Sequence, residues 1–385
     1  MNLRQLLFIF STILIFHQPI KAQQLSQEAT FSILTCNPGE AVYSMYGHTA
    51  IRVNDPAQGI DVVFNYGVFS FETPNFLYRF AKGQTDYLMM GQKFSSFLPE
   101  YVDDQRSVYE QILNLSPEGK TQLYQALIEN VRPENRTYRY NFFIDNCATR
   151  VRDMIEHNSG SPVRFTDNHP TESYRDLIKK FHHSFRWFDL GIDFLVGKKA
   201  EEPVSSYGQM FLPEYLMGQF AKAEITIDGK ALPLVRETRT LLEYPNSKLK
   251  SDLPWPAIVF AVFFLIVSGI TVRSYLLKKK NYWLDYGLFA LSGFAGFIIG
   301  WFTLFSEHPA MSPNYNLFWA FPSNLIFAGL WTMKKWRAMT RYYLWLAGVV
   351  LLLSLVTGQT FNPAVYFLML TLLVRVGVNL IPERK

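Results

Sequence analysis

The chain has 385 residues, of which 49% are hydrophobic and 18% are charged, and its formal net charge is +5. This positive charge gives no case for nucleic-acid binding, because the basic residues cluster beside apolar segments rather than along one predicted helix or strand. No histidine or acidic residue stands three or four residues from His48, so metal-ligand spacing is absent around it. We expect neither a metal site nor a cofactor.

The first 22 residues have the pattern of a signal peptide. Arg4 precedes an apolar stretch over 6–16, and Ala22 supplies a small residue at the expected cleavage site. The apolar stretch is too short to span a membrane. We therefore expect residues 1–22 to be a leader and residues 23–250 to form one exported domain with its own core.

Residues 23–250 mix strand-like and helix-like segments. Strands are predicted at 31–35, 49–54, 60–66, 86–91, 107–115 and 137–143. A hairpin over 223–235 would turn at Asp228-Gly229. Helices are predicted at 38–46, 73–82, 118–131, 146–157, 171–182 and 207–221. Short strands interleaved with helices favour an α+β domain built on an antiparallel sheet.

Of the two cysteines, Cys147 is the one whose neighbouring residues favour a role as a nucleophile. It follows Asp145 and Asn146, two residues of types that cap helices, and apolar residues recur at helical spacing after it. Unpaired N–H groups in the first turn of a helix favour the thiolate, so we expect a nucleophile with a lowered pKa. A small buried side chain, or a disulfide with Cys36 in an oxidising compartment, is the alternative.

A nucleophilic thiol needs a base, and His48 is the best-placed histidine. Gly47 precedes it, and the alternating residues that follow predict a strand that would anchor the imidazole. Asn65, on a strand expected to pair with that of His48, would orient the ring, unless it is an ordinary turn-forming asparagine. His182 and His183 lie in an aromatic, charged stretch typical of a solvated or half-buried helix face.

From Pro254 onward the chain is dominated by apolar segments. Membrane spans are predicted at 254–276, 283–305, 316–333, 342–357 and 363–380. Lysine and arginine follow the first and third spans and end the chain, whereas the loops 306–315 and 358–362 contain none. The positive-inside rule then places the C-terminus in the cytoplasm and both uncharged loops outside. The prediction for 251–385 is an α-helical domain of about five spans in the inner membrane, with residues 23–250 in the periplasm.

Several motifs occur together along most of the chain. They are Leu34-Thr-Cys-Asn-Pro-Gly-Glu40, Tyr46-Gly-His-Thr-Ala-Ile-Arg52, Asn65-Tyr-Gly-Val-Phe69, Asp145-Asn-Cys-Ala-Thr-Arg150, Phe211-Leu-Pro-Glu-Tyr-Leu216 and Glu307-His-Pro309 with Asn314-Tyr-Asn316. This set resembles the Lnb family of lipoprotein N-acyltransferases of Bacteroidota. The histidine precedes the cysteine, which resembles the circularly permuted papain-like families.

The resemblance implies that Cys147 and His48 occupy the catalytic positions of a permuted papain-like exported domain. It also implies transfer of an acyl chain from a phospholipid donor to the α-amine of a diacylated lipoprotein, through a thioester on Cys147. Five spans favour a lipid substrate, because one span would suffice as a tether. Two other functions stay open. One is a membrane-tethered cysteine hydrolase acting on peptides or other amides, and the other is a non-catalytic binding module with a Cys36–Cys147 disulfide.

The outer loop over 306–316 is a candidate substrate-binding element. It carries His308, Asn314 and Asn316 between apolar spans. These side chains would position the lipid headgroup or the incoming amine beside Cys147. The alternative is a capped interfacial turn, in which Asn314 or Asn316 begins the next helix.

Overall fold

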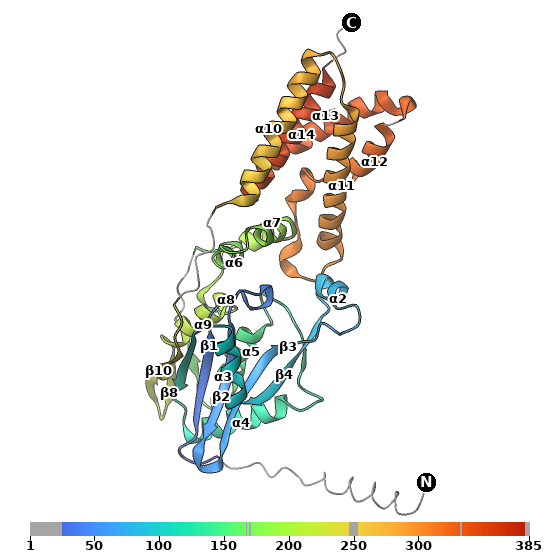
Figure 1. Cartoon of the computed structure of the whole chain (residues 1–385). Helices are drawn as coiled ribbons and strands as arrows, with labels where there is room; N and C mark the ends of the chain where they lie inside the picture. The colour runs from blue at the N-terminus through green and yellow to red at the C-terminus, as the bar shows by residue number, and fades with distance from the viewer. Residues whose placement is uncertain (1–24, 167, 169–170, 246–252, 332, 382–385) are drawn as a thin grey trace, which may run out of the picture.

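The computed structural model describes residues 25–166, 168, 171–245, 253–331 and 333–381. The expected signal peptide at 1–22 lies outside these residues. The described chain forms two parts stacked end to end, a mixed sheet-and-helix domain followed by a group of long helices (Figure 1). An α+β domain followed by a helical domain is what the sequence predicts.

A seven-stranded antiparallel sheet forms the frame of the first domain. Its strands in spatial order are β10 (Val235–Leu242), β5 (Val108–Leu113), β1 (Thr30–Cys36), β2 (His48–Asp55), β3 (Ile60–Val68), β4 (Asp86–Lys93) and β6 (Thr137–Arg139). A smaller sheet contains β7 (Val163–Arg164), β8 (Glu224–Ile227) and β9 (Lys230–Pro233). The predicted turn at Asp228-Gly229 joins β8 to β9, with positive φ at both residues.

Helices cover both faces of the large sheet, so its central strands are buried on two sides. On one face, α5 (Cys147–Asn158) contacts β2 and β3, and α4 (Pro117–Asn130) and α9 (Pro213–Phe220) contact α5. On the other face, α3 (Phe94–Asp103) packs its Phe97 against Ala50 and Val63. The runs of consecutive buried residues, Thr49–Ile51 in β2 and Val63–Tyr66 in β3, follow from this double burial.

Several expected helices differ in the structure. The predicted helix at 38–46 is wrong, because only a 3-10 turn forms, η1 (Val42–Ser44), and the Gly39 N–H bonds back to the Ser44 carbonyl. The predicted 207–221 helix is divided into α8 (Ser206–Gln209) and α9, because Pro213 lacks the N–H that an uninterrupted helix needs. The predicted 171–182 helix shortens to α6 (Tyr174–Lys179). Two further helices, α3 and α7 (Arg186–Leu195), form where none was expected from the sequence.

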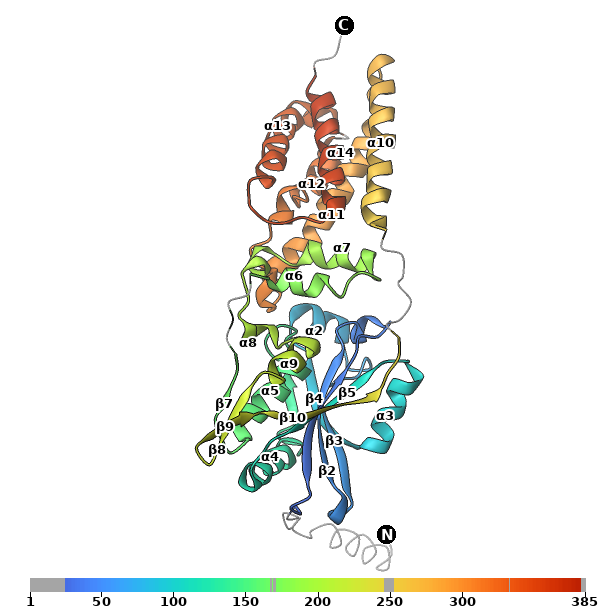
Figure 2. The ribbon, with the colours of Figure 1, turned by 90° about the vertical axis from the view of Figure 1, so that its left-hand side faces the viewer.

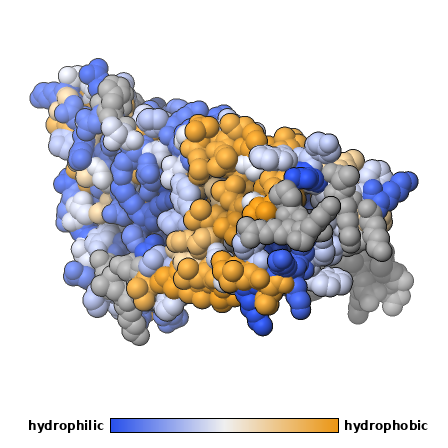
Figure 3. Space-filling view, turned by 90° about the horizontal axis from the view of Figure 1, so that it is seen from above, coloured by the Kyte–Doolittle hydropathy of each residue, from blue (hydrophilic) through white to orange (hydrophobic). Residues whose placement is uncertain are grey.

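Among the described residues of the second domain, three helices are long and apolar enough to cross a membrane: α10 (Trp255–Leu276), α11 (Tyr282–Phe305) and α14 (Pro363–Leu380). Two others in the described part do not reach this length of apolar helix: α12 (Ser323–Trp331) has 9 residues, and the apolar part of α13 (Arg337–Ser354) covers Met339–Ser354. The predicted third span starts instead as a 3-10 turn, η5 (Tyr315–Phe318), and α12 begins after Pro322. Hydrophobic side chains cover a broad area of the face seen from above (Figure 3).

The helices α6 and α7 form a layer between the sheet and the long helices (Figures 1 and 2). Here the exported domain touches both predicted outer loops. The Gly197 N–H donates to the Ala310 carbonyl at 2.8 Å, and the Thr360 N–H donates to the Glu201 carboxylate at 2.6 Å. Both loops therefore lie on the same side as the exported domain, as the distribution of lysine and arginine predicts.

Candidate active site

Cys147 is the first residue of α5, as the sequence predicts, and the cap that places it there is fully hydrogen-bonded. The Asn146 side-chain oxygen accepts from the N–H groups of Ala148 and Thr149 at 2.9 and 3.0 Å. The Asn146 amide donates to the Phe142 and Phe211 carbonyls at 2.7 and 2.8 Å. These four bonds fix the direction in which α5 starts, and with it the position of the thiol.

His48 is the first residue of β2, and its side chain contacts Asn65 on β3. The His48 Nε2 and the Asn65 Oδ1 are 3.0 Å apart. An amide oxygen only accepts hydrogen bonds, so Nε2 carries the hydrogen and Nδ1 keeps a lone pair. The predicted contact between the two residues is therefore present. The catalytic roles of both stay predictions.

The start of α5 meets the strands that carry His48 and Asn65. The backbone N–H of Thr49, the residue after His48, donates toward the Cys147 sulfur. Gly67 on β3 lies beside the thiol, since a Cβ there would stand 3.6 Å from the Cys147 Cβ. Within the described residues no hydrogen bond joins the imidazole to the thiol. Cys147 thus opens a helix that packs on the two strands that carry His48 and Asn65.

These elements meet at the end of the sheet that faces the helical domain. The turn between β2 and β3 lies at the opposite end, far from the long helices (Figure 1). Because β2 begins at His48 and β3 ends at Val68, both strands carry their site residues at the near end. A substrate held by the membrane would therefore meet this end first.

Burial controls the protonation of both proposed reacting groups. It raises the pKa of the Cys147 thiol, against the opposing effect of the N–H groups of Thr49, Ala148 and Cys147 itself. The expectation of a lowered cysteine pKa is therefore wrong, because desolvation outweighs the helix end. Burial also lowers the pKa of His48 to about 4, although the hydrogen bond to Asn65 acts in the other direction. Near neutral pH the site holds a thiol and a neutral imidazole.

Three tyrosines that were not expected from the sequence, Tyr87, Tyr138 and Tyr140, lie in or against the same apolar cluster as Cys147. The charge of Cys147 contributes to raising the pKa values of Tyr87, Tyr138 and Tyr140, after burial in each case. Tyr87 and Tyr140 stack with ring centroids 4.1 Å apart. Among the described residues, the buried hydroxyls of Tyr138 and Thr49 have no hydrogen-bond partner. The sequence does carry one sign of these tyrosines: Tyr138 and Tyr140 alternate just before the Cys147 motif.

Cys36 lies in a different apolar cluster from Cys147. It is buried on β1 with Leu34 and Val108, on the side of the sheet that α3 covers. Burial raises its pKa to about 12. Both cysteines are free thiols in the structure, which leaves the disulfide alternative without support.

His182 is not on a solvated or half-buried face, contrary to expectation, since only 1% of it is exposed. Its Nε2 lies 2.8 Å from the Tyr46 hydroxyl, and its Nδ1 lies 2.7 Å from the Asp189 carboxylate. The second carboxylate oxygen of Asp189 accepts from Asn362, at the start of α14. Tyr46 stands two residues before His48, so this buried chain ties the loop before β2 to the membrane domain.

The three predicted outer-loop residues have different surroundings. The Asn314 side-chain oxygen caps η5, as the capping alternative predicts, and its amide donates to the Phe194 and Leu195 carbonyls. Asn316 is 1% exposed and donates to the Asp193 carbonyl at 2.9 Å. His308 instead contacts α2 (Phe76–Lys82), with its Nε2 3.0 Å from the Phe80 carbonyl oxygen. In the described structure none of the three hydrogen-bonds to Cys147 or His48.

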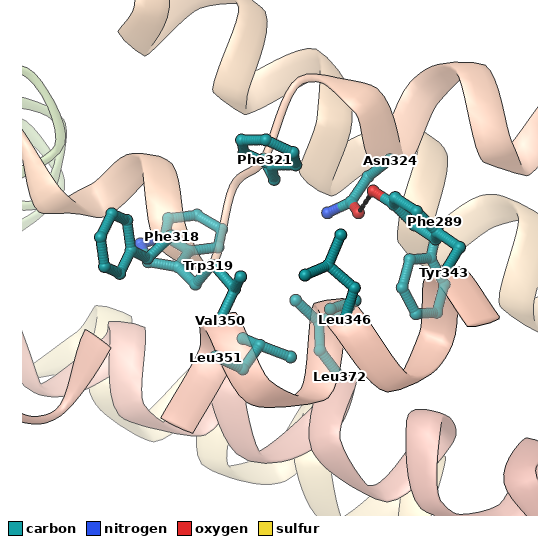
Figure 4. A pocket seen from close by; sticks show the side chains of 11 residues that line it. Phe289, Phe318, Trp319, Phe321, Asn324, Tyr343, Leu346, Val350, Leu351 and Leu372 are labelled. Atoms are coloured by element: carbon teal, nitrogen blue, oxygen red, sulfur yellow. Dashed lines mark hydrogen bonds between the residues drawn. The ribbon is translucent and has the colours of Figure 1, made fainter. Parts of the chain in front are cut away.

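Two cavities in the membrane domain lie away from this site. One is a hollow of about 10 Å³ among α11, α12 and α13, where the Tyr343 hydroxyl donates to the Asn324 side chain (Figure 4). It has room for about one water molecule, not for an acyl chain. The other, of about 350 Å³, is lined by Lys278, Lys279 and Lys280 between α10 and α11. Neither is bordered by Cys147.

Comparison with known families matches both parts of the chain. A family model described as the Lnb N-terminal periplasmic domain matches residues 16–180, and one described as the Lnb transmembrane domain matches residues 248–385. No curated protein and no solved structure matches the chain. The chain belongs to the Lnb family, with a periplasmic N-terminal domain and a multi-span transmembrane domain.

Proposed function

We propose that the protein transfers an acyl chain from a membrane phospholipid to the α-amine of a diacylated lipoprotein, with Cys147 as the nucleophile. The observation that carries this proposal is the placement of Cys147, at the start of a helix that packs on the strands of His48 and Asn65, at the end of the sheet that faces the helical domain. Membership of the Lnb family supports the same reaction.

In the first half of the reaction, the Cys147 sulfur attacks the ester carbonyl of the phospholipid. The thiol is neutral at rest, so its proton moves to Nδ1 of His48 as the carbon–sulfur bond forms. The carbon–oxygen ester bond then breaks, and His48 returns the proton to the departing alkoxide of the lysophospholipid. The product on the enzyme is a Cys147 thioester. In this proposal the N–H groups of Thr49 and Cys147, which act on the sulfur, also stabilise the negative oxygen between these steps.

In the second half, the α-amine of the lipoprotein attacks the thioester carbonyl. An amide bond forms and the carbon–sulfur bond breaks. One amine proton passes through His48 to the Cys147 sulfur, which restores the starting thiol. The acyl chain now resides on the lipoprotein, and the two half-reactions exchange substrates at one site.

We also propose that the domain over 23–250 has a permuted papain-like arrangement. Its support is the order of parts: a histidine on an early strand, β2, and a cysteine that opens a later helix, α5, packed on that strand. Asn65 then takes the role of the residue that orients the imidazole. The membrane domain over 251–385 holds this site at the bilayer surface.

The test is mass spectrometry of a lipoprotein N-terminus, from cells with the protein and from cells with a Cys147→Ala variant. We expect the N-acyl group with the natural protein and its absence with the variant. Cys36→Ser is the matched control, since it removes the other thiol, and N-acylation should continue. An N-acylated lipoprotein in Cys147→Ala cells would contradict the thioester route. Cleaved peptide amides without acyl transfer would favour the membrane-tethered hydrolase.

A further inference from the structure

A line of stacked aromatic rings joins the outer end of the membrane domain to the surroundings of Cys147. Successive ring centroids are 6.1, 5.5, 4.9 and 4.1 Å apart along the series Phe80, Phe76, Phe69, Tyr87 and Tyr140. We call these five rings the aromatic track. At its inner end Tyr87 belongs to the apolar cluster against which Tyr140 and Cys147 both pack.

The outer end of the track lies against the end of α11, a helix long and apolar enough to cross a membrane. The Tyr78 ring on α2 lies 5.9 Å from the ring of Trp301, which belongs to the last turns of α11. The Ser306 hydroxyl, just after α11, donates to the Ala81 carbonyl at 2.9 Å. These contacts hold α2 directly under the end of a membrane-spanning helix (Figure 1). Aromatic side chains concentrate at this depth in membrane proteins.

Large apolar side chains at the outer end are exposed rather than packed. Leu77 is 78% exposed and Phe71 is 66% exposed. The ring centroid of Phe71 lies 4.9 Å from that of Phe69 and 5.1 Å from that of Phe76, both of the track. Grouped apolar exposure beside a membrane span is typical of a segment that dips into the lipid interface. The inner rings Phe76 and Tyr87 are buried, so the track runs from lipid contact into the protein interior.

We infer that the aromatic track receives the acyl chain of the phospholipid donor, with Phe71 and Leu77 at its entrance. This inference rests on the proposed function and names the part of the donor that the site recognises. The acyl chain of the phospholipid leaves the outer leaflet beside α2 and lies along Phe76 and Phe69, while its ester carbonyl reaches Cys147. The two cavities described in the membrane domain do not serve as such a route, because one is too small and neither borders Cys147.

The track also gives His308 a place in substrate binding. Its ring lies 6.2 Å from that of Phe80, at the membrane end of the track. The headgroup is joined through the glycerol to the ester carbonyl, so a carbonyl at Cys147 keeps the headgroup at the inner end of the track. His308 is then near the methyl end of the acyl chain rather than near the reacting carbonyl.

The experiment measures the rate at which Cys147 becomes acylated in the full-length protein in detergent, with two donors. One donor is a palmitoyl phospholipid, and the other is p-nitrophenyl acetate, which has no long chain. Phe71→Ser and Leu77→Ser remove exposed apolar side chains at the entrance. Val102→Ser is the matched control, because Val102 is an exposed apolar residue on α3, on the other side of the sheet. The readout is the ratio of the long-chain to the short-chain rate.

We expect this ratio to fall about tenfold in each entrance variant and to stay unchanged in Val102→Ser, since each variant loses apolar contact with the chain. Equal ratios in all three variants would overturn the inference. If Cys147 of the natural protein accepts neither acyl group, the proposed function itself fails.

A second measurement uses the natural protein alone. A phospholipid with a photoreactive group at the end of its acyl chain should label residues 69–87, and labelling confined to α10–α14 would also overturn the inference.

Discussion

The Nε2 of His48 and the Oδ1 of Asn65 lie 3.0 Å apart across two neighbouring strands. This contact fixes which ring nitrogen carries the hydrogen, so Nδ1 remains able to take a proton. Together with the low pKa of His48, about 4, it keeps the imidazole a proton acceptor through the neutral range. The pair therefore suits a mechanism in which a neutral thiol loses its proton during attack.

Replacing Asn65 should change the pH dependence of acylation. An aspartate at this position would place a carboxylate beside the imidazole and favour its charged form. We expect Asn65→Asp to move the acid limb of the acylation rate upward from near pH 4, and Asn65→Ala to lower the rate at neutral pH by roughly tenfold. Rates of Cys147 acylation between pH 4 and 8 check this. An acid limb at the same pH in Asn65→Asp would contradict the pairing.

Removing the base should cost far more than removing its partner. His48→Ala should lower acyl transfer by about 10²–10⁴-fold, the usual contribution of a positioned general base. His157→Ala is the matched control, since His157 lies in the last turn of α5, away from the thiol. Transfer assays with membrane preparations of both variants measure this. Full turnover in His48→Ala would assign the imidazole a structural role.

The raised pKa of Cys147 predicts slow alkylation at neutral pH. The reactive form is the thiolate, so iodoacetamide labelling of Cys147 should rise with pH through and above 9. Peptide mass spectrometry distinguishes this thiol from Cys36, which should label only under more alkaline conditions. Rapid labelling of Cys147 that does not vary from pH 6 to 8 would show a resting thiolate and contradict the neutral pair.

Gly67 should be needed for activity as well as for folding. It has φ +93° and lies against Cys147, whereas Gly59 has φ +65° with open space where a Cβ would stand. Alanine at either position should cost about 1–2 kcal/mol in the free energy of unfolding, because left-handed backbone disfavours a Cβ. Thermal unfolding should thus be similar in the two variants, while acylation should fall only in Gly67→Ala. An equal loss of acylation in Gly59→Ala would show that the effect is general destabilisation.

Alanine substitutions of the three outer-loop residues should have two different effects, a loss of stability for the two asparagines and a loss of acyl transfer for His308. Asn316→Ala leaves the Asp193 carbonyl and the Trp319 indole without buried partners, which should lower stability by about 1–3 kcal/mol. Asn314→Ala should act similarly through the Phe194 and Leu195 carbonyls. His308→Ala should instead reduce acyl transfer while protein abundance is unchanged. Thermal unfolding and transfer rates for the three variants measure this. A normal transfer rate in His308→Ala would remove His308 from the substrate site.

Local patterns predicted the elements that place the site. The capping pair before Cys147, the alternation after His48 and the Asp228-Gly229 turn each depend on neighbouring residues, and each appears as expected. The lysine and arginine distribution likewise predicted which loops lie beside the exported domain.

Features that depend on burial were not predictable in this way. The pKa of Cys147 rises because distant segments cover it, and His182 is buried by contacts to Tyr46 and Asp189. The helix α3 carries Pro99 in its interior, which disfavours a helix locally, and it forms because Phe97 fills the core under the sheet. The aromatic track likewise joins residues from α2, β4 and the segment before α5.

The most direct measurement is intact mass spectrometry of the full-length protein after incubation with palmitoyl phospholipid, followed by addition of a diacylated lipopeptide with a free α-amine. The account predicts one added palmitoyl group on Cys147, cleavable by hydroxylamine, that disappears as the lipopeptide gains an amide-linked chain. Lipopeptide acylation that proceeds equally in Cys147→Ala, with no thioester on the natural protein, would contradict it.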